Sequence, residues 1–583
     1  MRLFVYRADK LINRSIPKLP WFVFNEDHRL VVKAERLLGA DNRLHLYMEV
    51  KAHLEKAKTE YAERLLPLHR KYHQQPEWLL SPVPGKVDWP PDYIVNRAII
   101  EALKVQLSRE SRDMVILTTN LHLVSLLKEL PGTDVDIRDA FWPINLKKEF
   151  RFWGECLYQV YQALKSKIVT RRLPVAQPQQ QFDVLIRTYV QESSFEPSGR
   201  FKDPYFRDLA QDLEVQGCQV WIEPNLSAVK NPGDLVSWVR SFDHRRFFIR
   251  ERHISLSDVL KTLAIAFKSR LLLQRIHPAF RQALRSYHGS QIVQGWLKSL
   301  TPEYLSRLGL RPKCVLFLWE NTPYEKVWIK NARERMSSVR LDGYTPAIQF
   351  DTHPVLTVTP EEYRFTPLPD RIICSSSYFR DWLLQAGLPK DRLILGPNLR
   401  QEIIADLDVG RPTRDMLFLF SIQTGMAVEA MNLILPLARS YPDRNFFLKL
   451  HPAVKLTEVL SLAGETQLPP NIQILEGALE KAFERCSRVV VIGPTTVILE
   501  ALCYGCRTAE FISKNIPNGS LFRPHFSLGV APVSEYQDLE RFLFDKRPLS
   551  GPACDPTYMF NSGWMTSPQE KARLFCEENS NHA

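Results

Sequence analysis

Short apolar runs alternate with amphipathic stretches from residue 182 to residue 545, and this alternation constrains the fold more than any other feature of the chain. The runs that we interpret as strands are 182–189, 215–222, 246–249, 315–319, 347–350, 371–375 and 393–395, then 416–421, 445–450, 472–475, 489–493 and 508–512. Strands that alternate with helices favour a parallel sheet with helices on both faces. Because the alternation starts again near residue 415, it predicts an α/β chain with two Rossmann-like domains.

The region before residue 172 has a different pattern. Apolar residues recur there at helical spacing, through 44–54 and 93–107, and only 3–6 and 114–119 resemble strands. A Pro- and Gln-rich stretch at 173–181 is typical of a linker. At about 100 to 200 residues per domain, 583 residues allow about three domains. We therefore predict a mainly helical domain at 1–172, Rossmann-like domains at 182–405 and 410–545, and a C-terminal extension at 546–583.

Neither Rossmann-like domain carries the glycine pattern of dinucleotide enzymes. There is no G-x-G-x-x-G after a first strand and no G-x-x-x-x-G-K-[ST] in the chain. Dinucleotide oxidoreductases and P-loop NTPases are therefore disfavoured. Two doubly wound domains in succession still predict a cleft where the carboxyl ends of both sheets face each other, and such folds bind nucleotides there.

Two polar motifs follow predicted strands of the second Rossmann-like domain. His451 and Pro452 follow the strand 445–450, and a His at that place can donate to a phosphate oxygen. Thr495 and Thr496 open a helix after 489–493, where free backbone N–H groups and hydroxyls suit an anion, and Glu500 lies one turn further on. The alternatives are a His that caps a loop and a simple helix cap by either Thr.

With these two motifs the sequence resembles bacterial glycosyltransferases of the GT-B fold, in particular the sialyltransferase-like and capsule or surface-carbohydrate enzymes. That group carries an H-P motif followed by an S/T-S/T motif at a helix start, matched here by His451-Pro452 and Thr495-Thr496. The resemblance implies that these residues hold a nucleotide sugar, frequently CMP-linked, through its phosphate and ribose. It also implies that 410–545 is the donor domain and that 182–405 faces the acceptor.

Three further stretches, 199–209, 319–326 and 368–379 with the following 395–400, resemble surface-carbohydrate biosynthesis proteins of this kind. The likeness covers about residues 182–545 and does not extend to 1–170. One departure from the family pattern concerns the acidic motif of two acids followed by Gly, for which 341–343 is the nearest stretch. The resemblance therefore leaves the catalytic base unassigned.

The catalytic base has to be ranked from chemistry instead. Transfer to an acceptor needs a group that takes the proton of the acceptor hydroxyl, and it should come from the domain opposite the nucleotide. Glu320 ranks first because it follows the strand 315–319 directly, beside Trp319, where burial would raise its pKa. Asp203, in the long loop after the first strand, ranks second. An ion pair of Glu320 with Lys326 or a nearby Arg is the alternative to catalysis.

Asp342 and Asp351 rank behind those two as candidate bases, and His353, in a second His-Pro pair, is interpreted as a chain turn. No His, Cys or Asp cluster has metal-ligand spacing, so the sequence predicts a metal-independent reaction without a cofactor. The helix start and basic side chains would neutralise the leaving phosphate.

The net charge of +12 is concentrated in one segment. Between residues 240 and 313 there are 15 Lys and Arg against 4 Asp and Glu. Such a segment can attract nucleic acid, an anionic membrane or an anionic substrate. Its Arg residues alternate with a helical apolar face at 256–273 and 271–287, which favours a membrane surface over nucleic acid.

Nine scattered cysteines, an odd number, indicate a reducing compartment rather than a disulfide framework. The C-x-x-C pair Cys503 and Cys506 has no second pair, which argues against a zinc site. No signal peptide and no bilayer-length apolar run is visible. The sequence therefore predicts a cytoplasmic protein that is at most peripheral to the inner face of the cell membrane.

These observations predict a metal-independent glycosyltransferase. Its partners would be a nucleotide-sugar donor, a surface glycan or lipid-linked glycan acceptor and an anionic membrane surface, with no nucleic acid. The alternatives are a CDP-alditol phosphotransferase and a non-catalytic GT-B scaffold or binding subunit. A phosphotransferase of that class would need a second phosphate-binding His, and the stretch 493–496 contains none.

Overall fold

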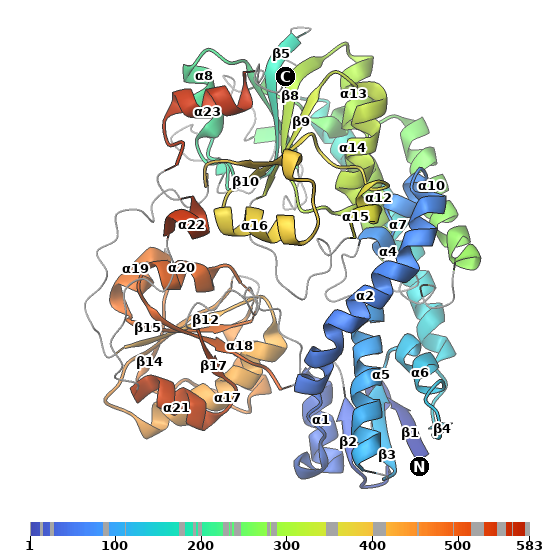
Figure 1. The fold of residues 1–583 in the computed structure, drawn as a ribbon, viewed down its shortest axis with the longest axis vertical. Helices are drawn as coiled ribbons and strands as arrows, with labels where there is room; N and C mark the ends of the chain where they lie inside the picture. The colour runs from blue at the N-terminus through green and yellow to red at the C-terminus, as the bar shows by residue number, and fades with distance from the viewer. Residues whose placement is uncertain are drawn as a thin grey trace.

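The computed structural model describes most of the chain, in three regions that each contain a parallel sheet (Figure 1). The described residues are 2–11, 16–23, 28–85, 92–110, 112–173, 181–190, 194–195, 201–225, 233, 236–237, 246–276, 280, 288–345, 359–399, 415–451, 454–477, 479–493, 495–514, 530–544, 556–561 and 564–577.

The N-terminal region is mainly helical around a small parallel sheet of order β2-β3-β1-β4. The strands are β1 (Arg2–Arg7), β2 (Trp21–Val23), β3 (Met114–Thr118) and β4 (Asp134–Ile137). The helices are α1 (His28–Leu38), α2 (Tyr47–Tyr72), α3 (Pro76–Leu79), α4 (Pro82–Gly85), α5 (Asp92–Arg109), α6 (Leu121–Leu127) and α7 (Trp142–Thr170). Strands β2 and β4 are additions to the sequence-based expectation.

The second sheet has the doubly wound strand order β11-β10-β9-β8-β5-β6-β7, and all pairs are parallel. Its strands are β5 (Gln181–Tyr189), β6 (Val220–Asn225), β7 (Arg246–Phe247), β8 (Arg311–Leu318), β9 (Arg340–Thr345), β10 (Arg371–Cys374) and β11 (Leu393–Leu395). Its helices are α8 (Leu209–Val215), α10 (Leu256–Arg275), α12 (Gly289–Lys298), α13 (Thr301–Arg307), α14 (Pro323–Arg335), α15 (Pro360–Tyr363) and α16 (Ser377–Gln385).

The third sheet repeats this topology with the order β14-β13-β12-β15-β16-β17, again all parallel. Its strands are β12 (Met416–Phe420), β13 (Phe446–Lys449), β14 (Ile472–Ile474), β15 (Arg488–Ile492), β16 (Arg507–Phe511) and β17 (Ala531–Val533). Its helices are α17 (Thr424–Ser440), α18 (Leu456–Leu462), α19 (Leu479–Arg485), α20 (Val497–Cys503) and α21 (Tyr536–Phe544). Both sheets have the Rossmann strand order. The α/β fold with two successive Rossmann-like domains, the GT-B arrangement, is thereby confirmed.

Both Rossmann-like sheets are buried on their two faces. On β8, Leu316 and Leu318 join one apolar cluster, while Val315 and Phe317 join another on the opposite face. A strand that is apolar on both sides is typical of a parallel sheet between helical layers. This burial explains why the continuous apolar runs identified most of these strands from sequence.

The C-terminal residues return to the first Rossmann-like domain (Figure 1). Helices α22 (Pro556–Phe560) and α23 (Pro568–Phe575) pack against α16 and α8. The buried amide of Asn561 donates to the backbone carbonyls of Cys374 and Gly396, at 3.2 and 2.8 Å. These contacts make the C-terminal segment part of the wall of that domain.

One disulfide corrects the interpretation of the cysteines. The structure joins Cys218, just after α8, to Cys576, at the end of α23, with their Cα atoms 6.8 Å apart. The other described cysteines are buried and form no disulfide. The partners are 358 residues apart, so only the packing of α23 on α8 makes them neighbours. The expectation of a chain without disulfides is wrong at this pair.

Several strand limits differ from the sequence-based prediction. The predicted strand 215–222 begins only at Val220, because Gly217, at φ +83°, turns the chain between α8 and β6. The predicted helix from Thr495 begins at Val497. Strands β9 and β17 were not predicted. The predicted strand 347–350 lies outside the described residues.

The N-terminal region packs closely on the first Rossmann-like domain. The buried ammonium of Lys326, on α14, donates to the carbonyl of Pro84 at 2.6 Å. A Cβ on Gly85 would lie 2.3 Å from Cγ of Pro323, so only glycine allows this approach. Helix α7 packs along α12. Through α4, the N-terminal region therefore reaches the first turn of α14.

Candidate functional site

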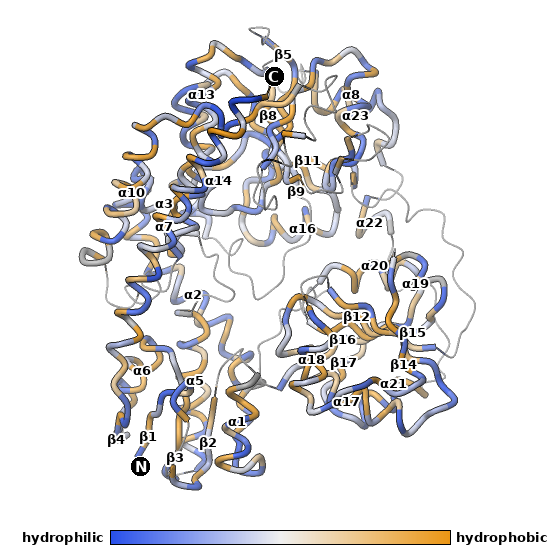
Figure 2. The backbone as a smooth tube through the Cα atoms, turned by 180° about the vertical axis from the view of Figure 1, so that it is seen from behind, coloured by the Kyte–Doolittle hydropathy of each residue, from blue (hydrophilic) through white to orange (hydrophobic). Residues whose placement is uncertain are grey.

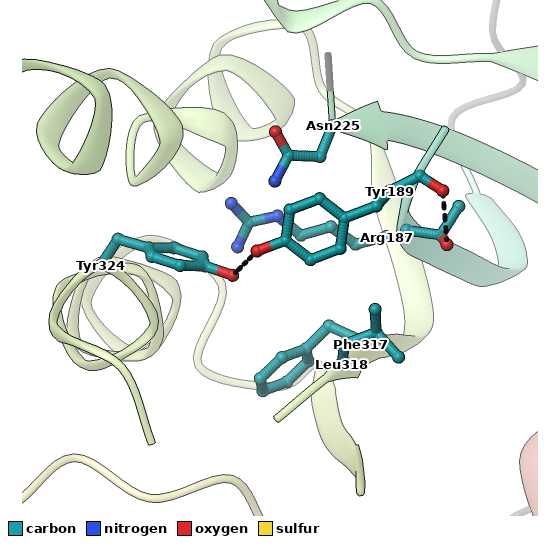
Figure 3. Close-up of a pocket in the computed structure, with 7 residues that line it drawn as sticks. Arg187, Tyr189, Asn225, Phe317, Leu318 and Tyr324 are labelled. Atoms are coloured by element: carbon teal, nitrogen blue, oxygen red, sulfur yellow. Dashed lines mark hydrogen bonds between the residues drawn. The ribbon is translucent and has the colours of Figure 1, made fainter. Parts of the chain in front are cut away.

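The strand order of the first Rossmann-like sheet reverses between β5 and β8, and a small pocket lies at the carboxyl ends of these two strands (Figure 3). Open α/β sheets bind ligands at this kind of switch point. The residues that line the pocket are Arg187, Thr188, Tyr189, Asn225, Phe317, Leu318 and Tyr324.

Two tyrosines meet at the centre of this pocket. The hydroxyl oxygens of Tyr189, at the end of β5, and Tyr324, in the first turn of α14, are 2.6 Å apart (Figure 3). The guanidinium of Arg187 lies 5.6 Å from the ring centroid of Tyr324, and the ammonium of Lys298 lies 5.2 Å from the same centroid. Burial raises the pKa of both tyrosines, so both hydroxyls stay protonated and can donate.

A buried network of ion pairs around Glu223 includes Arg187, which also lines the pocket. Glu223 of β6 is fully buried and pairs with Arg187 at 3.5 Å and with Arg250 at 3.4 Å. The hydroxyl of Thr301 donates to the same carboxylate at 2.6 Å. Burial, together with the charges of Arg250 and Arg187, lowers the pKa of Lys298 to about 7. The ammonium of Lys298 can therefore lose its proton near neutral pH.

A larger cavity of about 230 Å³ adjoins the pocket and shares Tyr324 with it. It is lined by Gln291, Gln294, Gly295, Lys298, Thr322, Pro323 and Tyr324. Its wall therefore comes from α12 and from the start of α14. The amides, the lysine and the tyrosine offer hydrogen bonds to a polar ligand such as a sugar.

Glu320 lies in the turn between β8 and α14, two residues after Leu318 of the first cavity and two before Thr322 of the second, and it lines neither cavity itself. The residue is half-buried, and burial raises the pKa of its carboxyl group. The backbone of Asn321 turns there at φ +56°, which aims the chain from the strand end into α14. The predicted ion pair of Glu320 with Lys326 is not formed, since the ammonium of Lys326 instead contacts Pro84.

Glu325 was not among the predicted site residues, although it lies one turn from Glu320. Its Oε2 accepts the backbone N–H groups of Glu320 and Thr322, each at 3.0 Å. Burial and the nearby charge of Glu320 raise the pKa of Glu325 to about 8. Glu325 therefore holds the turn that carries Glu320, and it is mostly neutral at pH 7.

Asp203 is buried, and burial raises its pKa to about 6. Its Oδ1 accepts three hydrogen bonds, from the backbone N–H groups of Tyr205 and Phe206 at 2.8 Å and from the hydroxyl of Thr188 at 3.0 Å. This carboxylate holds the turn 203–207 against the end of β5. Thr188 connects it to the pocket.

The lower-ranked candidates lie elsewhere. Asp342 is buried within β9, where Arg371 binds both of its oxygens, at 2.9 and 2.6 Å, and Arg340 binds one at 3.2 Å. Its pairing with arginines explains its burial. Asp351 and His353 lie outside the described residues.

The residues predicted to bind the donor lie around the carboxyl ends of β13 and β15, with β12 between these strands. His451 is exposed, two residues past β13. Thr495 and Thr496 follow β15; Thr496 is the N-cap of α20 without a side-chain cap bond, and the hydroxyl of Thr495 accepts the N–H of Val497 at 3.4 Å. Glu500 is half-buried one turn further. Pro452 lies outside the described residues.

The strands that carry these residues are close enough to serve one ligand. Neighbouring strands are about 4.8 Å apart, so β13 and β15 are separated by roughly 10 Å. That distance matches a nucleoside phosphate. Gly493, at φ +85°, brings the chain after β15 against Ser421 at the end of β12.

The predicted residues therefore form two groups on two sheets. Glu320 and, through Thr188, Asp203 lie at the first switch point, whereas His451, Thr495, Thr496 and Glu500 lie on the second sheet. Sequence reasoning missed Tyr189, Tyr324, Lys298 and Glu325. Tyr189 could have been found from its place at the last position of a predicted strand, beside the strand that carries Glu320.

Within the described part of the chain, no group of three His, Cys, Asp or Glu side chains could hold a metal ion. Among the same residues, no helix combines the length and apolar character needed to cross a bilayer.

No protein-family model and no curated protein sequence matches the chain. Solved structures similar to it include the S. aureus MnaA–UDP complex (12% identity, TM-score 0.39, covering 67% of this chain and 95% of that one). They also include UDP-GlcNAc 2-epimerase from Neisseria meningitidis bound to UDP-GlcNAc (13%, 0.39, 67% and 98%) and Acinetobacter baumannii MurG (12%, 0.37, 68% and 99%). The fold assignment rests on the strand orders described above.

Proposed function

We propose that this chain is a glycosyltransferase that moves a sugar from a nucleotide donor, CMP-linked, to a surface glycan or a lipid-linked glycan precursor. One observation carries the proposal. The chain builds two successive Rossmann-like sheets, and Glu320, a carboxylate whose pKa is raised by burial, comes two residues after Leu318, which lines a pocket at the switch point of the first sheet. A base of this kind and a separate nucleotide-binding sheet are the two parts that glycosyl transfer requires.

We assign Glu320 as the general base. It would take the proton of the acceptor hydroxyl as that oxygen attacks the sugar and the sugar–phosphate bond breaks. The raised pKa makes its carboxylate a stronger base, and Glu325, mostly neutral at pH 7, adds little opposing charge. Asp203 is the weaker assignment because three donors already occupy its Oδ1.

The acceptor sugar would occupy the cavity of about 230 Å³ beside this base. Its hydroxyls would bond to the phenol of Tyr324 and to the side-chain amides of Gln291 and Gln294, which line the cavity. Lys298, with a pKa near 7, can act there without a fixed charge. A neutral sugar suits such a lining better than an anion does.

The donor would bind at the strand ends of the second sheet. His451 would donate to the phosphate, Thr495 and Thr496 would contribute hydroxyls, and Glu500 would accept from the ribose, with Pro452 fixing the turn after His451. The start of α20 and basic side chains would neutralise the leaving phosphate, which supports a reaction without a metal ion. CMP as the nucleotide rests on the resemblance of the two motifs.

A thermal-shift screen with CMP, CDP, UDP and GDP tests the donor site. We expect CMP to raise the melting temperature most, and His451→Ala to weaken CMP binding about 10- to 100-fold, since one hydrogen bond to a charged group contributes about 1.5–3 kcal/mol. Thr457→Ala, an exposed Thr on α18, should keep the shift. Normal nucleotide binding by His451→Ala would contradict the phosphate assignment.

Donor hydrolysis tests the base separately. Glu320→Gln should keep the thermal shift with nucleotide but lose turnover about 10²- to 10⁴-fold, the usual contribution of a general base. The matched control is Glu214→Gln, an exposed carboxylate on α8, which should turn over normally. A chain that binds nucleotide but never hydrolyses any sugar donor would be a scaffold, and the enzyme proposal would fail.

A further inference from the structure

Helix α7 carries a row of exposed apolar side chains along almost its whole length. Phe150 is 72% exposed, Trp142 68% and Ile168 63%. The row recurs every three, four or seven residues, so it occupies about 100° of the helix circumference. Its members are Trp142, Leu146, Phe150, Leu157, Tyr161, Leu164 and Ile168. Scattered single apolar residues need no explanation, but a continuous row of this length marks an interaction surface.

Helix α10 has a second row of the same kind, made of Leu256, Leu260, Phe267 and Leu271. The two helices lie side by side and antiparallel. Near one end Lys167 donates to the carbonyl of Ile254, and near the other Arg270 pairs with Glu149 at 3.6 Å. Figures 1 and 2 show both helices on the outer side of the molecule, away from the C-terminal sheet.

The two rows face the same way. The residue after the contact residue Glu149 is Phe150, and the residue after its partner Arg270 is Leu271; both belong to the rows. In a pair of antiparallel helices, two side chains that each follow a mutual contact by one residue are rotated by the same angle about their own helix axes. Both side chains therefore face the same side of the pair. The rows therefore form one apolar surface, which we call the α7–α10 face.

Lysines line the two outer edges of the α7–α10 face in a repeated pattern. At four places an exposed Lys comes directly after a residue of one of the two rows: Lys147, Lys165, Lys261 and Lys268. The two helices together contain nine Lys or Arg against three Asp or Glu. Of these acids, Glu149 and Glu155 are paired with Arg270 and Arg151, and Asp258 is buried. The face is therefore apolar along its middle and positive along its edges.

We propose that the α7–α10 face binds the surface of an anionic phospholipid bilayer. An apolar row flanked by lysines matches helices that lie in the plane of a membrane, with the apolar side chains among the acyl chains and the lysines at the headgroups. The row from Trp142 to Ile168 is about 40 Å long at 1.5 Å per residue. A second copy of the chain fits less well, because self-association would bring two positive faces together.

The face also lies close to the acceptor cavity. Gln294 lines that cavity, and its amide donates to the carbonyl oxygen of Gln159 on α7 at 3.0 Å. One helix, α12, thus separates the bilayer-binding face from the cavity. A lipid-linked acceptor in the bilayer would reach the cavity from this side. This last step rests on the proposed function, whereas the membrane contact itself does not.

Flotation with large unilamellar vesicles, without nucleotide or acceptor, tests the membrane contact. We expect the full chain to bind vesicles of phosphatidylcholine with 30% phosphatidylglycerol, and to bind pure phosphatidylcholine vesicles at least tenfold more weakly. Leu157→Glu with Ile168→Glu should lower the partition coefficient on anionic vesicles at least tenfold. Val215→Glu, the same change at a 71% exposed apolar residue of α8, should leave it within twofold.

A second double variant tests the lysine charges, and it gives an independent result if the first double variant misfolds. Lys261→Gln with Lys268→Gln should weaken binding to anionic vesicles roughly 30-fold, at about fivefold per lysine near an anionic surface. The proposal is overturned if the wild-type chain does not float with anionic vesicles, or if neither pair of substitutions weakens flotation. Sedimentation velocity tests whether a second copy of the chain covers the face instead. A dimer that Leu157→Glu with Ile168→Glu dissociates, together with no vesicle binding, would assign the face to a second copy.

Because these readouts need no turnover, they separate this inference from the proposed enzyme. Vesicle binding by an inactive chain would leave the membrane contact standing and remove only the acceptor argument.

Discussion

Gly493 offers the sharpest test of how the strand ends of the second Rossmann-like sheet are built. It follows β15 at φ +85°, a conformation that side chains other than glycine rarely adopt. A Cβ at this position would lie 2.1 Å from Oγ of Ser421 and 3.1 Å from its Cβ. Gly493→Ala therefore introduces two separate costs, a strained backbone and a clash between two strand ends.

The two costs can be estimated and separated. A left-handed conformation costs an L-residue about 1–2 kcal/mol, and overpacking by one methyl costs about 1–3 kcal/mol, which gives about 2–5 kcal/mol for Gly493→Ala. Gly464→Ala is the control for the backbone, because Gly464 has φ +79° and no atom within 4 Å of its Cβ position. It should cost only about 1–2 kcal/mol.

Ser421→Ala is the partner variant. The hydroxyl of Ser421 is buried and makes no hydrogen bond within the described residues, so its removal alone should change stability by less than about 1 kcal/mol. In the Ser421→Ala background the closest contact of a Cβ on Gly493 becomes 3.1 Å. The cost of Gly493→Ala should then fall toward that of Gly464→Ala, and the remaining difference should reflect this tight contact.

Hydrogen exchange read by mass spectrometry is the appropriate assay. Residues 410–545 contain no Trp, so tryptophan fluorescence does not report on this domain. The opening free energies of peptides from β12 and β15 in the four variants complete the cycle. If Gly493→Ala costs no more than Gly464→Ala, or if Ser421→Ala relieves none of the cost, the close approach of these strand ends is wrong.

Three further predictions concern the first Rossmann-like domain. Glu325 has a pKa of about 8 against an ordinary 4.5, so the free energy of unfolding should fall as pH rises from about 4.5 to 8. Urea unfolding followed by tryptophan fluorescence should show this fall in the wild-type chain and not in Glu325→Gln. Lys298 has a pKa of about 7, below its ordinary 10.5, so the free energy of unfolding should rise between pH 7 and 10.5. The same assay should show no such rise in Lys298→Met. Asp203→Ala should cost about 2–4 kcal/mol because three donors lose their acceptor, whereas Asp203→Asn, which keeps Oδ1, should cost less and retain donor hydrolysis. If a stable Asp203→Asn variant lost donor hydrolysis, the result would favour Asp203 over Glu320 as the catalytic base.

Two of the strands that the sequence did not predict, β9 and β4, share a physical cause. Strand β9 contains Arg340, Asp342 and Gly343, a composition that resembles a loop. Asp342 is buried only because Arg340 and Arg371 neutralise it, and Arg371 comes from the neighbouring strand β10. A local pattern cannot contain a partner that lies 29 residues away. In β4, two of the four residues are Asp, which hides an edge strand in the same way.

The two halves of the candidate site differed in how far they could be predicted. Residues after strongly apolar strands, such as His451 and Glu320, could be placed at strand ends because the strand itself was evident. The contact between Tyr189 and Tyr324 could not, since these residues are 135 positions apart and meet only because β5 and β8 are neighbours in the sheet. Lys298 could not be recognised because its environment depends on Arg187 and Arg250 from other elements.

The helical N-terminal region, whose role the sequence left open, connects these features. It supports the turn of Glu320 from one side, through the bond between Pro84 and Lys326 and the approach of Gly85 to Pro323. Through α7 it also supplies most of the proposed membrane face, one helix away from the acceptor cavity. A displacement of α4 would therefore move the start of α14, and with it both Glu320 and Tyr324. If the proposed function and the proposed membrane contact both hold, this region would fix the acceptor side of the site relative to the membrane.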